Sequence, residues 1–202
     1  MAIVLYLGKD VKDYEKRGKE IIAQRIRAGE IRCELCAQPM KQHSSYERGI
    51  KESGQKIQIQ IVWCKKCKQG HALLPDFLLP NKHYSGNEIE SVLIDSQGWG
   101  KEGWGKEESA VNEIETEASE STVRRWIKQI GERIKRAVSL LKYIFMHILQ
   151  KTLSELTISE NATGYAELEE ILEKAPVTVE YSGNKLGLAN IFLGINGRSA
   201  YI

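Results

Sequence analysis

The stretches Cys33-Glu-Leu-Cys36 and Cys64-Lys-Lys-Cys67 contain all four cysteines of this 202-residue chain. Two C-x-x-C pairs separated by a few tens of residues are typical of a site that holds zinc with four thiolates. Zinc is a borderline-soft ion that accepts tetrahedral sulfur ligands without redox chemistry. We therefore expect a structural Zn²⁺ ion on these four cysteines, and a closed thiolate shell leaves no open position for a catalytic water.

Other roles for the cysteines remain open. Two disulfides are disfavoured because the apolar start of the chain lacks the basic residues of a secretion signal, and a cytosolic chain keeps its thiols reduced. A redox pair fits less well because no cysteine is left over, and an iron–sulfur cluster is the remaining metal alternative. His43, His71 and His83 are expected beside the site or on the surface rather than as ligands.

The residues between the cysteine pairs predict a small antiparallel sheet. Residues 56–61 alternate strictly, so that Ile57, Ile59 and Ile61 face one side of a strand. Residues 42–50 are the expected partner strand. Two cysteine turns on such a sheet form a zinc ribbon, and its folding depends on the metal because its own core is small.

Further elements are predicted on both sides of the ribbon. Before the ribbon we expect a short strand or docking arm at 1–7 and a basic helix at 10–29 capped by Asp10. After it we expect an extended connector at 70–80 and a helix opened by Ser85, with Glu88 as its capping-box partner. The remaining expected elements are a short acidic helix at 107–118, a long helix from Ser119, a helix at 162–175 and a strand at 177–181. Gly131 is a candidate bend in the long helix.

The start of the long helix is the second informative stretch. A short helix, a serine-rich turn and Ser-Thr-Val-Arg-Arg-Trp follow the order of a helix-turn-helix, whose second helix enters the major groove. Between Ser121 and Lys142 there are seven basic residues and one acidic residue. The residues expected to reach DNA are Glu120, Ser121, Thr122, Arg124, Arg125 and Lys128, while Val123, Trp126 and Ile127 pack inward.

The same motifs carry a family resemblance. The second cysteine pair is followed by Gly-His-Ala-Leu-Leu-Pro-Asp-Phe, a Tyr-Ser helix start and Ser-Thr-Val-Arg-Arg-Trp. Together they resemble a family of uncharacterised bacterial proteins, known mainly as a domain of unknown function, with a transposase-like zinc ribbon, a helix-turn-helix and an association with mobile elements. The resemblance covers about 31–130 and implies DNA binding without an established activity. The chain departs from that pattern around 113–116 and in its repeated Gly-Trp-Gly-Lys-Glu unit.

These observations predict an α+β protein: a small antiparallel zinc ribbon, a mainly helical helix-turn-helix region and a small α/β C-terminal extension. The expected segments are 1–30 for an N-terminal strand and basic helix, 31–84 for the ribbon and connector, 85–150 for the helix-turn-helix with its long helix, and 151–202 for the extension. The net charge is +2, and no apolar run approaches the ~18 residues that span a bilayer. A cytoplasmic protein without a membrane partner is expected.

An enzyme is not expected. Metal-dependent strand transfer needs several converging carboxylates, and the chain has only four aspartates, none of them after residue 95. The expected function is that of a zinc-stabilised helix-turn-helix protein that binds double-stranded DNA, either a transcriptional regulator or a mobile-element accessory factor. The alternative is a zinc-ribbon adaptor that binds a protein partner. A homodimer through the apolar stripe of residues 134–149 is a further option.

Overall fold

The computed structural model describes residues 2–96, 114–147, 158–159, 162, 164–174 and 179–195. The chain divides into two compact units, the first formed by Met1–Gly86 with Glu180–Ser199 and the second by Asn87–Val179 with Ala200–Ile202. Glu180–Ser199, which is part of the predicted C-terminal extension, joins the first unit. Helices and strands are both present, as predicted for the α+β class. None of the described helices combines the length and the apolar character needed to cross a membrane.

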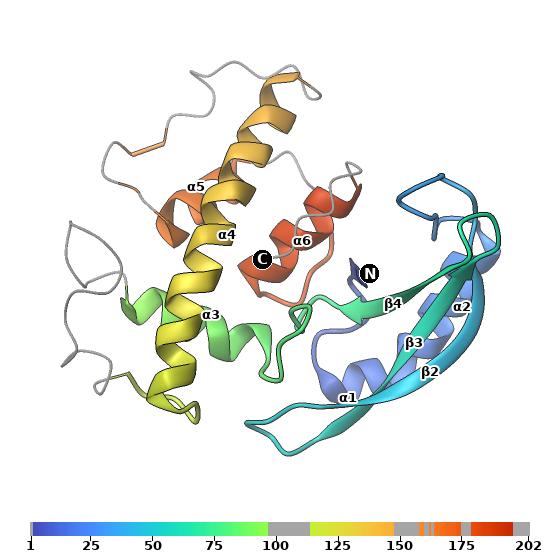
Figure 1. The fold of residues 1–202 in the computed structure, drawn as a ribbon, viewed down its shortest axis with the longest axis horizontal. Helices are drawn as coiled ribbons and strands as arrows, with labels where there is room; N and C mark the ends of the chain where they lie inside the picture. The colour runs from blue at the N-terminus through green and yellow to red at the C-terminus, as the bar shows by residue number, and fades with distance from the viewer. Residues whose placement is uncertain are drawn as a thin grey trace. The chain divides into compact units, whose positions relative to one another are not determined.

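One mixed sheet organises the first unit (Figure 1). Its strands in the described residues are β1 (Ala2–Leu5), β2 (Lys41–Gly49), β3 (Lys56–Cys64) and β4 (Gln69–Pro75), in the order β1-β4-β3-β2. The pairs β2/β3 and β3/β4 are antiparallel, whereas β1 runs parallel to β4. The strands predicted at 42–50 and 56–61 are confirmed, and the start of the chain is a strand. The parallel strand β1 makes this sheet larger than the antiparallel ribbon that was predicted.

Strand β4 corrects part of the connector predicted at 70–80. It pairs with β3 on one side and with β1 on the other. Pro75 is tolerated because it is the last residue of the strand, opposite Leu5, where the missing N–H interrupts little of the ladder. The N–H of Asp76 then donates to the carbonyl of Leu5 at 3.0 Å. The apolar run beyond the second cysteine pair therefore lies in the middle of the sheet.

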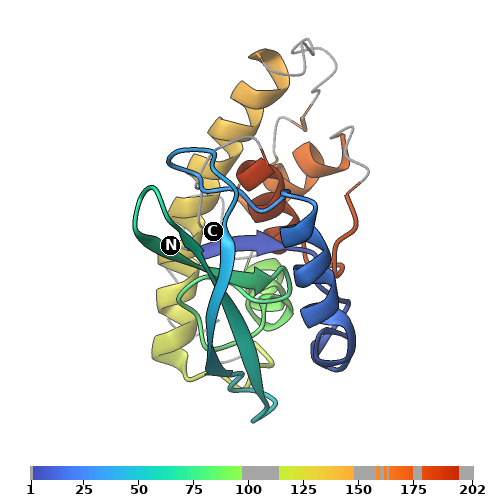
Figure 2. The same cartoon turned by 90° about the vertical axis from the view of Figure 1, so that its right-hand side faces the viewer.

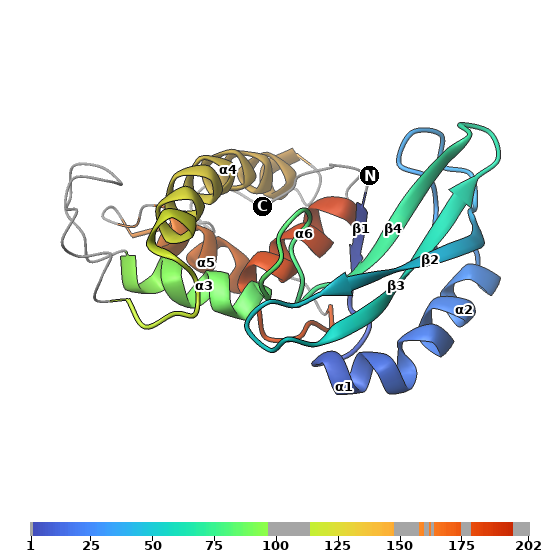
Figure 3. The same ribbon diagram turned by 60° about the horizontal axis from the view of Figure 1, so that its bottom comes forward.

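Helical residues between β1 and β2 lie along one side of the sheet (Figure 3). They are α1 (Val11–Asp13), the π-helical segment η1 (Tyr14–Gly18) and α2 (Lys19–Arg27). Asp10 caps them as predicted, since its Oδ1 accepts the N–H of Asp13 at 2.9 Å. The hydroxyl of Tyr14 donates to the carbonyl of Gln58 in β3 at 2.8 Å. Gly18 leaves room for that ring, because a Cβ there would lie 2.6 Å from it.

Helix α6 (Lys185–Ile195) lies beside β1 and belongs to the first unit (Figure 2). Residues 186–193 are buried. Asn184 caps the helix, because its Oδ1 accepts the N–H of Gly187 at 2.7 Å. A Cβ on Gly187 would lie 2.1 Å from the carbonyl oxygen of Asp76, so only glycine allows this close approach. Residues 179–181 do not form the predicted strand, and 177–178 lie outside the described residues.

The described part of the second unit is helical, with α3 (Gly86–Asp95), α4 (Glu120–His147) and α5 (Tyr165–Glu173). Lys142 of α4 forms an ion pair with Glu167 of α5, with 2.6 Å between Nζ and Oε1. The hydroxyl of Tyr165 in α5 donates to the carboxylate of Glu90 in α3. Helix α4 runs without a break through Gly131. Its predicted apolar stripe is buried at Val123, Trp126, Ile127, Ile130, Ile134, Val138, Leu141, Ile144 and Phe145.

The segment before α4 departs from the predicted acidic helix. Residues 107–113 lie outside the described residues, and 114–118 are not helical. The hydroxyl of Thr116 and the N–H of Glu117 both donate to Oε1 of Glu88 in α3. Such side-chain hydrogen bonds compete with helix formation. The backbone N–H of Ser85, which a capping box would direct to Glu88, donates to Oε1 of Glu52 at 2.7 Å. The helix-turn-helix stays a prediction.

Candidate metal centre and basic helix

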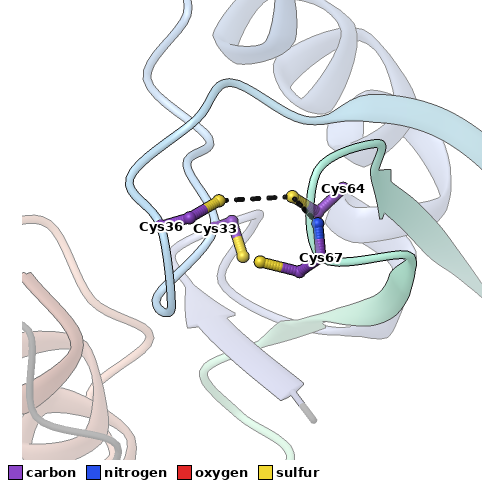
Figure 4. Close-up of side chains that lie close together, drawn as sticks. All are labelled: Cys33, Cys36, Cys64 and Cys67. Carbon is purple, nitrogen blue, oxygen red and sulfur yellow. Dashed lines mark hydrogen bonds between the residues drawn. The ribbon is translucent and has the colours of Figure 1, made fainter.

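The four cysteines meet at one end of the sheet of the first unit (Figure 4). Cys33 and Cys36 lie in the loop between α2 and β2, Cys64 ends β3, and Cys67 lies in the turn before β4. Their Sγ atoms are all within 4.8 Å of one another, and all four are free thiols. Because four thiolates at about 2.3 Å from zinc lie roughly 3.8 Å apart, this cluster has the dimensions of a tetrahedral site.

Both cysteine pairs lie on the same kind of turn. The residue after each pair has a positive φ, 56° for Ala37 and 54° for Lys68, which reverses the chain tightly. In the first turn, the N–H of Ala37 donates to the carbonyl of Cys33 at 2.7 Å. In the second, the N–H of Cys67 donates to Sγ of Cys64 at 3.4 Å. The turns therefore direct the sulfurs toward a common point.

Ionisation of the sulfurs is uneven. The backbone N–H of Cys67 holds the pKa of Cys64 at about 7, below its usual range and against the effect of burial. The pKa of Cys67 is raised to about 12, first by its hydrogen bond with Cys36 and then by burial. Adjacent thiolates repel each other, so the cluster cannot lose all its protons without a compensating cation. A divalent metal ion removes that obstacle, which makes the donor set suitable for such an ion.

His71 lies next to the cluster, on β4. It is fully buried, and its Nε2 is 3.8 Å from Sγ of Cys33. Burial lowers its pKa, so the neutral ring can present an N–H to the sulfur. His71 thus occupies the neighbouring position expected for it, whereas His43 and His83 are exposed. Within the described chain, the four cysteines are the cluster suited to a metal ion.

No structural role was predicted for Asp76 from the sequence. It follows β4 and is fully buried, and its Oδ2 accepts the N–H of Ser182 at 2.6 Å. Its Oδ1 has no hydrogen-bond partner in the described part of the chain, and burial raises the pKa of this carboxyl. An aspartate inside an apolar run bounded by Pro75 and Pro80 was the signal for it in the sequence.

The predicted DNA-contacting residues lie at the start of α4 in the second unit. Glu120, Ser121, Arg125 and Lys128 are exposed, and Thr122 and Arg124 are half-buried. The residues predicted to pack inward, Val123, Trp126 and Ile127, are buried, which confirms that part of the prediction. Ser119 precedes the helix, and its carbonyl accepts the N–H groups of Thr122 and Val123 at 2.8 and 3.0 Å.

Arg124 already has a partner on its own helix. Its Nη2 and Nε lie 2.6 and 2.9 Å from Oε1 of Glu120, one turn earlier. Exposed pairs of this kind contribute about 0–1 kcal/mol to stability. The guanidinium can therefore exchange this carboxylate for another anion.

A basic face runs along α4 opposite its apolar stripe. Because a helix turns by about 100° per residue, Arg125, Lys128, Lys135 and Arg136 project from the side opposite Ile130 and Ile134. All four are exposed. Glu132 is the acidic residue within this span. We call these four residues the basic face of α4.

One family match covers both the cysteines and the start of α4. Residues 33–126 match the family described as "Domain of unknown function (DUF6431)". The matched segment begins at Cys33 and ends at Trp126, so it includes both cysteine pairs and the first turns of α4. The match confirms the resemblance to a family of uncharacterised domains. No curated protein and no solved structure matches the chain.

Proposed function

We propose that this protein is a cytoplasmic, zinc-stabilised helix-turn-helix protein that binds double-stranded DNA and acts as a transcriptional regulator or a mobile-element accessory factor. In this proposal Cys33, Cys36, Cys64 and Cys67 hold a structural Zn²⁺ ion. Helix α4 is the recognition helix and contacts DNA through its first turns. Residues 114–118, at the end of the predicted first helix of the motif, are not helical. The proposal therefore rests on α4 and not on that first helix.

Zinc is the metal that best suits the cysteine cluster. Four sulfur donors within 4.8 Å of one another match a tetrahedral thiolate site, and soft ligands of this type disfavour magnesium and calcium. Such a site is closed, so the ion would stabilise the turns rather than activate water. An iron–sulfur cluster uses the same four-thiolate set, and metal analysis of the purified protein separates the two.

The observation that carries the DNA proposal is the separation of the two faces of α4. Val123, Trp126 and Ile130 are buried on one face, while Arg125 and Lys128 are exposed on the other. Arginine suits bidentate contacts with guanine, and lysine suits phosphate. A helix anchored by its apolar face and presenting cations at its N-terminal turns meets the requirements of a recognition helix.

The adaptor alternative has less support from the long helix. It requires the apolar stripe of α4 to be available to a partner, and Ile134, Val138 and Leu141 are buried within the chain. The same burial removes the described part of that stripe as a surface for a homodimer. A protein partner would therefore need a different surface.

The proposal is tested by selecting bound duplexes from a random DNA pool. Zinc-loaded wild type is compared with Arg124→Ala/Arg125→Ala and with Lys12→Ala/Lys16→Ala, which removes two exposed charges from the first unit. We expect a sequence motif enriched by wild type and by the control variant and lost with the α4 variant. No enrichment by a folded, zinc-loaded wild type would reject duplex recognition and favour the adaptor.

A further inference from the structure

The second cysteine turn carries a surface that the zinc site itself does not explain. Its lysines Lys65, Lys66 and Lys68 are exposed. Lys41, also exposed, lies on β2 opposite Trp63, the residue that precedes Cys64. We call these four lysines, together with the rings of His43 and Trp63, the lysine knuckle.

The two rings of the lysine knuckle lie together on the sheet. Trp63 is paired with Gly70 of β4, and its ring carbons would be 3.6 and 3.8 Å from a Cβ on that glycine. The indole therefore lies across Gly70, where no side chain intervenes. On the other side, the ring of His43 is 5.3 Å from that of Trp63 between centroids and tilted by 40°. The exposed imidazole and the half-buried indole form a small aromatic platform beside the lysines.

The charge of this surface is one-sided. Residues 56–75, which comprise β3, the second cysteine turn and β4, contain no aspartate or glutamate. On β2, Glu47 lies nearer the other end of the strand and pairs with Lys56 at 2.9 Å. The other cysteine turn carries one acidic residue, Glu34, between Cys33 and Cys36. Three of the four exposed cations of the lysine knuckle therefore lie in a segment that carries no acidic residue, which suits a polyanion.

We propose that the lysine knuckle binds single-stranded nucleic acid, with phosphates on the lysines and an unpaired base against His43 and Trp63. Stacking on a ring requires a free base face, and the bases of a duplex are stacked on each other. Lysine is a point charge without the bidentate geometry that reads a base edge, so binding is tolerant of sequence. This surface lies in the first unit, separate from the basic face of α4, and the inference shares only its class of partner with the proposed function.

The test measures binding of a labelled oligothymidine and of a labelled duplex by the full zinc-loaded chain. In Lys65→Gln/Lys66→Gln/Lys68→Gln, we expect at least a tenfold loss of affinity for the single strand. The slope of log affinity against log salt should fall by about 2, since each phosphate contact on a single strand contributes roughly 0.7. The matched control Lys12→Gln/Lys16→Gln/Lys19→Gln removes three exposed lysines from α1, η1 and α2 and should leave both values unchanged. Zinc content confirms that the variants keep the metal.

A second variant separates stacking from charge. Trp63→Leu should weaken single-strand binding while leaving the salt slope at its wild-type value, because no cation is lost. Wild-type affinity and slope in the triple knuckle variant, or an equal loss in the control, would overturn the inference. So would a loss confined to the duplex. Failure of the proposed function appears elsewhere, as duplex binding that is absent or unaffected by Arg124→Ala/Arg125→Ala.

Discussion

The two units support their candidate functional residues by different means. In the first unit, the turns that carry the cysteines converge on one another, and the buried imidazole of His71 lies beside Cys33. In the second unit, the basic face of α4 is supported by an apolar stripe from Val123 to Phe145. In our proposal the first arrangement depends on a bound ion, whereas the second depends on hydrophobic packing. Loss of metal and loss of core volume should therefore damage different parts of the chain.

The largest effect is expected from Cys64→Ser. Losing a thiolate should lower Zn²⁺ affinity by more than about a hundredfold, since even neighbouring hydrogen-bond partners contribute 10–100-fold. Hydrogen exchange should accelerate in β3 and β4 and remain slow in the middle of α4. Leu35→Ser is the matched control, because Leu35 lies in the other cysteine turn and is 57% exposed. Loss of protection in α4 together with the sheet would contradict the contrast between the units.

The complementary change is Ile134→Ala in α4. Ile134 is fully buried, and removing its side chain should lower the free energy of unfolding by about 2–5 kcal/mol. Denaturant unfolding followed by helical circular dichroism measures the loss, and the zinc content should not change. The neighbouring exposed residue gives the control, since Lys135→Ala should alter stability by only about 0.5 kcal/mol or less. Zinc release from Ile134→Ala under native conditions would argue against the independence of the metal centre from the core of α4.

A smaller effect on the same metal centre is expected from His71→Ala. If the buried imidazole donates to Sγ of Cys33, its removal should reduce Zn²⁺ affinity about 10–100-fold. Competition with a chromophoric chelator measures this. His83→Ala, at an exposed histidine, should retain wild-type affinity. Equal affinities for both variants would mean that His71 only fills space.

Asp76 predicts a pH dependence of stability in the first unit. Burial raises the pKa of this carboxyl, so the folded chain holds a proton that the unfolded chain releases above its ordinary pKa of 3.8. The free energy of unfolding should then fall as pH rises from that value through the raised pKa. Asp76→Asn should flatten this part of the curve and stabilise the protein at neutral pH. If the free energy of unfolding of the wild type instead rose with pH relative to the variant over this window, the pKa of Asp76 would be lowered by folding and not raised.

The smallest effect concerns Glu120. Its carboxylate pairs with Arg124 and stands at a helix turn proposed to face phosphate. Glu120→Gln should raise duplex affinity a few-fold, corresponding to roughly 1 kcal/mol or less for an exposed charge. Titration of a labelled duplex measures it. Lower affinity in this variant would instead support the contact between Glu120 and DNA that was predicted from the sequence.

Local patterns in the sequence predicted several elements correctly. The alternation in 56–61 became β3, the serines before Val123 became the start of α4, and the cysteine spacing led to one cluster. Each of these depends on residues close in sequence or on a ligand set with its own geometry. For the same reason, the buried stripe of α4 could be named in advance.

The missed features depend on contacts between distant residues. Nothing in the apolar stretch after residue 185 reveals that α6 returns to pack beside β1. Pro75 favoured a connector because proline interrupts regular secondary structure. Its position at the end of β4 is tolerated through its pairing with Leu5, which the sequence does not reveal. The predicted acidic helix did not extend to 114–118, where Thr116 and Glu117 bond to Glu88 of α3.

Duplex affinity measured across a range of salt concentrations tests the central proposal most directly. Zinc-loaded wild type is compared with Arg125→Ala/Lys128→Ala, which removes two exposed cations from the basic face of α4. Each phosphate contact on duplex DNA contributes about 0.9 to the slope of log affinity against log salt. The proposal predicts salt-dependent binding by wild type and a slope lower by about 2 in the variant. Identical slopes, or no salt-dependent duplex binding by wild type, would contradict it.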